Sequence, residues 1–212
     1  MMNIRSNKLG WIVACGLLGG LVATGFQAGT EKVGVVDISK VVEDSDFGKA
    51  NQAAFKKMKG VRESLLEFID QNRILTNEQA LRLKELALKD SPSAAETAES
   101  ERIKADVVQA AKRNAELNAK QNLTAEDRTL LEDYARRAQT MDQLERRWYT
   151  DFTTEMQNWA DKQKLASVDK ARAAVQKVAR EQGFTVVFEA GIAPYGANDI
   201  SAACLQAMNA VK

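Results

Sequence analysis

Residues 141–160, MDQLERRWYTDFTTEMQNWA, carry the pattern that decides the fold of the long central part of this chain. Apolar side chains recur there at three- and four-residue steps, which places them on one face of a helix. We favour the interpretation of this stripe as the seam between two helices, because a helical arm must bury one face. The alternative is a surface that binds other chains through unspecific apolar contacts. The stripe consists of Met141, Leu144, Trp148, Phe152, Met156 and Trp159, and the neighbouring Tyr149 lies off it.

The helical pattern extends over most of residues 44–183. It has a soft interruption near residues 72–76 and a firmer one at 90–92, because Pro92 disfavours a helical residue before it. Thr76 and Thr124 each precede acidic residues, so both are predicted to cap the start of a helix.

Residues 118–123, NAKQNL, are the best candidate for a reversal of chain direction. An uninterrupted helix of sixty residues is about 90 Å long, which is too long to fold into one globule. The sequence therefore predicts a long antiparallel helical hairpin, resembling a coiled coil, over residues 44–182.

Both ends of this region carry strand patterns. Residues 32–39, KVGVVDIS, are rich in valine and predict a short strand that ends at Asp37. Gly183 is expected to cap the long helix in the left-handed conformation. The segment FTVVFE, residues 184–189, then predicts a second strand.

After this strand, Ala190 and Gly191 permit a tight turn, and residues 192–197, IAPYGA, predict an extended return that completes a β-hairpin. Asn198 or Asp199 is expected to cap a final helix over residues 200–211. The predicted fold class is therefore α+β, mainly α, with a helical hairpin attached to a small β-body that both strand-forming ends build.

The composition argues against several classes of function. The chain of 212 residues has a formal net charge of +1, which favours neither nucleic acid nor an anionic membrane as a partner. It contains no histidine, the commonest general base and metal ligand. The cysteines Cys15 and Cys204 are too far apart for a zinc knuckle, and Cys204 is predicted to be a core residue. We therefore expect no catalytic, cofactor-binding or metal-binding residues and predict that the protein is not an enzyme.

The N-terminus predicts export. Arg5 and Lys8 precede an apolar run over residues 9–24, as in a secretory signal peptide. Cleavage is expected after Gly25, with Ala28 as the alternative position. A retained membrane anchor and a lipid-modified Cys15 stay as alternatives, although the run is shorter than the about 20 residues that span a bilayer.

Three segments together resemble the Skp/OmpH family of periplasmic chaperones: KVGVVDISKVV from Lys32, VAREQGFTVVFEAG from Val178, and APYGANDISAACLQAMN from Ala193. The resemblance covers nearly the whole chain after the signal peptide. It implies a homotrimer in which residues 32–43 and 183–212 form the trimeric body and residues 44–182 form the arm. An apparent insertion around 76–123 and the nearly neutral charge of the processed chain depart from the family's strongly basic members.

The resemblance also implies partners and site residues. Unfolded outer-membrane or envelope proteins are the implied clients, with Met141, Leu144, Trp148, Tyr149, Phe152, Met156 and Trp159 as candidate client-binding residues. The implied trimer residues are Val33, Val35, Val36, Val186, Val187, Phe188, Ile192 and Tyr195. We therefore expect an ATP-independent periplasmic holdase. A structural coiled-coil scaffold of the envelope, tethered by an uncleaved N-terminus, is the alternative.

Overall fold

The computed structural model describes residues 31–193 and 198–210, so the predicted signal peptide and Tyr195 lie outside the described residues. The described residues are mostly helical and form one small sheet of two strands. It forms two compact units. The terminal unit combines the described residues up to Ser45 with those from Asp169 onward, and the helical unit comprises Asp46–Val168. The predicted arm ended at residue 182, whereas residues 169–182 group by their contacts with the terminal elements.

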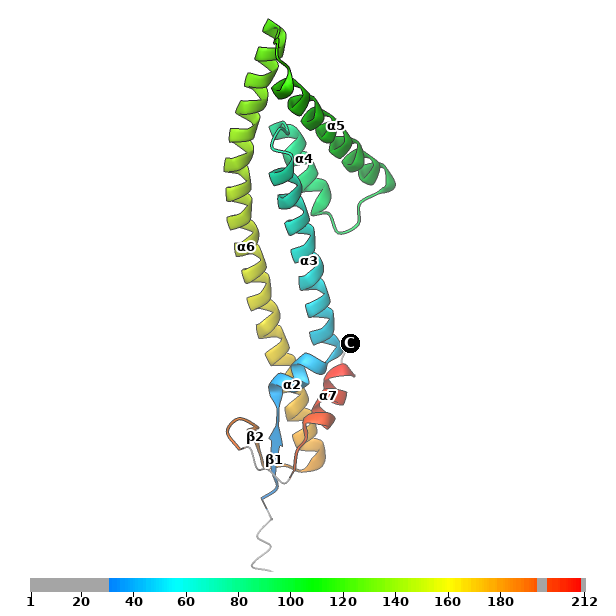
Figure 1. The fold of residues 1–212 in the computed structure, drawn as a ribbon. Coiled ribbons are helices and arrows are strands. Elements are labelled where there is room, and N and C mark those ends of the chain that lie inside the picture. Colours follow the sequence, from blue (N-terminus) through cyan, green and yellow to red (C-terminus); the bar gives the residue numbers. More distant parts are fainter. Residues whose placement is uncertain (1–30, 194–197, 211–212) are drawn as a thin grey trace, which may run out of the picture. The chain divides into compact units, whose positions relative to one another are not determined.

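Four helices build the helical unit (Figure 1). They are α3 (Asp46–Gln71), α4 (Asn77–Ala87), α5 (Ala94–Ala119) and the first part of α6 (Ala125–Gln182), a helix of 58 residues that continues into the terminal unit. The chain reverses between α5 and α6, at the position where the sequence predicted a reversal.

The interruption at residues 72–76 is a further reversal, which the sequence analysis underestimated as a soft break. Figure 1 shows α4 running back beside α3. The Asn72 side chain donates to the Phe68 carbonyl oxygen at 2.9 Å, so it ends α3 without glycine or proline. Leu75 is fully buried and anchors the turn. The burial of Leu75 depends on distant parts of the chain and cannot be recognised from local sequence.

Hydroxyl side chains start three of these helices. Thr76 forms a capping box with Gln79 at the start of α4. Thr124 exchanges hydrogen bonds with Asp127 at the start of α6, so both predicted helix starts are confirmed. Ser93 forms a third capping box, with Glu96, that the sequence analysis did not identify. Each box satisfies backbone N–H groups that have no partner inside the helix.

The core of the helical unit joins α3, α4, α5 and α6. Ring and charge pairs show how α3 and α6 lie together: Phe55 is 6.0 Å from Trp159 between ring centroids, and Arg62 contacts Glu155 at 3.0 Å. Residues later in the sequence of α3 therefore meet residues earlier in the sequence of α6. The buried residues of this core are Leu65, Ile69, Leu75, Ala80, Leu83, Val107, Met141, Trp148 and Phe152.

The terminal unit contains β1 (Val33–Val36), α2 (Ile38–Asp44), β2 (Val186–Glu189), α7 (Ser201–Asn209) and the end of α6. The strands pair in parallel, with Val33 opposite Val186 and Val35 opposite Phe188. The first strand ends at Val36, one residue before the predicted end at Asp37, and Asp37 caps α2.

Of the predicted return strand of the β-hairpin, residues 192–197, only Ile192 and Ala193 lie within the described residues. The Ile192 and Ala193 amides donate to the Glu189 carbonyl oxygen and form a turn. The chain then pairs with the other edge of β1, where the Val35 amide donates to the Asn198 carbonyl oxygen at 2.8 Å. A turn sequence permits a hairpin. In the structure, however, both edges of β1, about 150 residues earlier in the chain, are paired: one edge with β2 and the other with the segment at Asn198.

The helix ends of this unit follow the predictions in part. Gly183 has a φ of 71° and closes α6 in the left-handed conformation, as predicted. The predicted capping of the last helix is confirmed for Asp199, whose carboxylate accepts a hydrogen bond from the Ser201 amide at 2.8 Å, although Ile200 occupies the N-cap position of α7. The Asn198 side chain instead donates to the Val33 carbonyl oxygen at 2.9 Å and ties this segment to β1.

Candidate functional site

A groove with an apolar and aromatic lining lies between α3 and α6, and we call it the Tyr149 groove. Its volume is about 370 Å³. The Tyr149 side chain is 66% exposed at this groove, so it is available to another molecule. The lining residues are Phe55, Lys59, Arg62, Glu63, Leu66, Tyr149, Phe152, Thr153, Met156, Gln157 and Ala160.

Charges of both signs border the Tyr149 groove. Arg62 lies over the Phe152 ring at 5.3 Å and contacts Glu155 at 3.0 Å, so its guanidinium is held in place by both helices. Lys59 and Glu63 form an exposed pair at 3.5 Å. Because such exposed pairs are weak, their side chains can turn toward a ligand of either charge at little cost.

The structure separates the predicted client-binding residues into two groups. Met141, Trp148 and Phe152 are buried in the core, where they hold the helices together. Lys84 covers this part of the core, with its ammonium group 4.9 Å from the Trp148 ring centroid. The other predicted residues reach the surface to different degrees: Tyr149 is exposed, and Leu144, Met156 and Trp159 are half-buried.

The predicted trimer residues also differ in exposure. Val35 and Val36 are buried, Val187 is half-buried, and Ile192 is 77% exposed. Paired residues of neighbouring strands point to the same face of a sheet. The register therefore places the exposed Val33, Val186 and Phe188 on one face, which we call the apolar sheet face.

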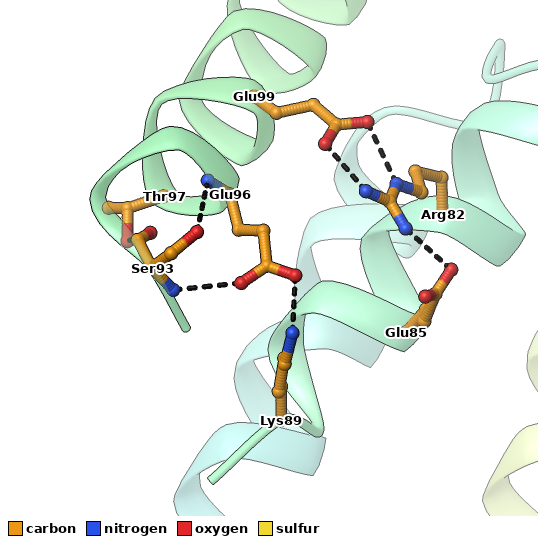
Figure 2. A network of polar contacts seen from close by, with 7 residues as sticks. All are labelled: Arg82, Glu85, Lys89, Ser93, Glu96, Thr97 and Glu99. Carbon is orange, nitrogen blue, oxygen red and sulfur yellow. Dashed lines mark hydrogen bonds and ion pairs between the residues drawn. The ribbon is translucent and has the colours of Figure 1, made fainter. Parts of the chain in front are cut away.

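A network of charges joins α4 to α5 (Figure 2). The Arg82 guanidinium donates to both carboxylate oxygens of Glu99, at 2.8 and 2.6 Å, and also contacts Glu85. Lys89 donates to Glu96, whose other oxygen accepts from the Ser93 amide. The Ser93-x-x-Glu96 spacing is a capping-box signature, so the contact between Ser93 and Glu96 could have been predicted from the sequence. The contact between Arg82 and Glu99 needs the tertiary fold.

The Lys89 ammonium group, together with the Ser93 amide, lowers the pKa of Glu96 to about 2. Because the pKa is lowered in the folded state, the ionised carboxylate stabilises the fold at pH values above its ordinary pKa of 4.5. This stabilisation is lost as the pH falls toward 2. We expect the carboxyl carbon of Glu96 to titrate near pH 2 by NMR, and Lys89→Met to move its midpoint up toward 4.5. An unchanged midpoint in Lys89→Met contradicts this assignment.

Cys204 is a fully buried core residue, as predicted. Burial, followed by the charge of Asp199, raises the pKa of its thiol to about 11. In a Cys15→Ser background, the thiol should react with a disulfide reagent at neutral pH roughly a hundredfold more slowly than in the unfolded chain. Equal rates with and without denaturant, followed by absorbance, contradict the burial of this thiol.

Among the described residues, no group of three or more acidic or cysteine side chains is arranged to hold a metal ion. The helices of residues 31–193 and 198–210 include none that is long and apolar enough to cross a membrane. No family model, curated protein or solved structure matches this chain.

Proposed function

We propose that the protein is an exported, ATP-independent holdase that binds unfolded outer-membrane or envelope proteins in the periplasm. The Tyr149 groove carries this proposal. It offers an exposed aromatic ring beside the flexible side chain of Met156, with charges of both signs at its border. Such a surface accepts many apolar segments weakly instead of one ligand tightly. The proposed activity needs no catalytic residue and no cofactor.

The apolar sheet face supports association of the chain with copies of itself. Val33, Val186 and Phe188 are each about 40% exposed (39%, 42% and 42%). Exposed apolar groups that gather on one face indicate an interaction surface. We take the trimeric state from the resemblance to the Skp/OmpH family. Three chains would then bind one client through several weak contacts, and avidity would supply the affinity.

The paired helices support the proposed arm. Phe55 meets Trp159, Arg62 meets Glu155, and Arg73 meets Asp142, in the order expected for an antiparallel coiled coil. The half-buried residues of the stripe could contact a client when the arm opens. This would let clients of different sizes bind to the same chain.

The test is an aggregation assay. An unfolded outer-membrane β-barrel protein is diluted from urea, and light scattering follows its aggregation with and without the purified protein. One trimer per client should slow aggregation, and Tyr149→Ser should weaken the effect without changing thermal stability. Leu165→Ser is a matched control, because Leu165 is a similarly exposed (69%) side chain outside the groove. No slowing at stoichiometric trimer rejects the holdase proposal.

The second candidate is a coiled-coil scaffold of the envelope. The 58 residues of α6 favour it, as do the ion pairs that α6 forms with Arg62 of α3 and with Arg73 in the turn after α3, since a long braced helix suits a spacer. A scaffold leaves the aggregation of an unfolded client unchanged. The mass of the N-terminus in cells shows whether residues 1–25 are removed or retained as a tether.

A further inference from the structure

A second groove lies between α3, α4 and α5, and none of its lining residues belongs to the Tyr149 groove. We call it the lysine groove, and its volume is about 720 Å³. Its lining residues are Ala53, Lys56, Lys57, Gly60, Val61, Ser64, Leu65, Phe68, Leu83, Ala87, Ser100 and Lys104.

The lysine groove has an apolar floor and a purely cationic border. Leu65 and Leu83 are almost fully buried in its floor. Its border carries three lysines and no carboxylate among the lining residues. Lys104 is paired with Glu101, at 2.8 Å. Within the part of the chain that the structure describes, Lys56 and Lys57 form no salt bridge, so their charges are available to a partner.

Gly60 gives an independent indication that something binds here. Glycine in the interior of a helix costs about 0.5–1 kcal/mol relative to alanine. A Cβ at this position would meet no other atom within 4 Å, so the packing of the described chain does not require glycine. Glycine removes a side chain where the backbone of another molecule approaches closely.

We propose that the lysine groove docks a short amphipathic helix of a partner protein, with apolar side chains on one face and acidic side chains along its flanks. The apolar face would rest on Leu65, Phe68 and Leu83, and the acidic flanks would pair with Lys56 and Lys57. Binding of an amphipathic helix in an apolar groove between helices is a common mode of peptide recognition.

The face that α3 presents to the groove fits a helix. Ala53, Gly60 and Ser64 are separated by seven and four residues, so they lie along one line of α3. Three small side chains in a line let a second helix backbone approach. The wall opposite α3 is formed by α4 and α5, where Leu83 and Ser100 line the groove. The bidentate contact between the preceding residues, Arg82 and Glu99, holds this wall together.

The test uses synthetic peptides and the full chain. The probe is a fluorescein-labelled peptide of roughly sixteen residues, with leucines at helical spacing on one face and glutamates on both flanks. Fluorescence anisotropy measures its affinity. We expect binding that weakens with salt, and binding at least about tenfold weaker for the same peptide with lysines in place of glutamates.

Variants locate the site. Lys56→Glu/Lys57→Glu should weaken binding of the acidic peptide at least about tenfold, while the matched Lys162→Glu/Lys164→Glu pair on α6 should not. Gly60→Ala should weaken binding although it raises the thermal stability, because its Cβ has free space in the unbound chain. Equal binding by the Lys56→Glu/Lys57→Glu variant, or equal binding of acidic and basic peptides, overturns the proposal. The experiment does not depend on holdase activity.

Discussion

Replacing Trp148 with alanine is expected to lower the free energy of unfolding by about 3–5 kcal/mol, the usual cost of removing a buried tryptophan. Trp148 is 2% exposed and belongs to the core cluster that joins α3, α4, α5 and α6. The substitution leaves a cavity beside Phe152, whose ring centroid lies 6.2 Å away. It also removes the ring beneath the Lys84 ammonium group.

The next residue provides the control. Tyr149 is 66% exposed, so Tyr149→Ala should change the free energy of unfolding by no more than about 0.5 kcal/mol. Urea denaturation followed by far-ultraviolet circular dichroism measures both variants. Similar losses in the two variants would contradict the assignment of Trp148 to the core. Trp148→Ala tests the interpretation of the stripe as a seam, whereas Tyr149→Ala, off the stripe, should affect client binding but not folding.

Introducing aspartate at both Val186 and Phe188 should convert the proposed homotrimer into a monomer. In an assembly through the apolar sheet face, the two carboxylates would be buried without partners, and an unpaired buried charge costs several kcal/mol. The folded monomer should tolerate the change, because both positions are 42% exposed in the single chain. Light scattering coupled to size exclusion measures the mass, and circular dichroism verifies the fold.

Leu165→Asp is the matched control for this prediction. Leu165 is an exposed apolar residue of the helical unit and is not part of the sheet. It should leave the mass of the assembly unchanged. If the wild-type protein is itself a monomer, or if the double variant keeps the wild-type mass, association through the apolar sheet face is wrong.

Local sequence determined the buried face of the long helix and several helix ends. The three- and four-residue spacing of Met141, Trp148 and Phe152 places these side chains on one face, and the structure buries all three. Thr76, Thr124 and Gly183 act within one helical turn of their own positions, which is why pattern analysis could identify them. Local sequence did not determine the parallel pairing of β1 with β2, because the pattern of a strand does not specify which other strand it pairs with.

Only the tertiary structure decided which elements meet. The reversal at residues 72–76 depends on the burial of Leu75 in the core, and the contact of Arg82 with Glu99 joins residues on two different helices. The order of the sheet depends on β1, whose two edges bind segments about 150 residues later in the chain. Such contacts are selected by the burial of side chains from distant positions, and local propensity carries no information about that choice.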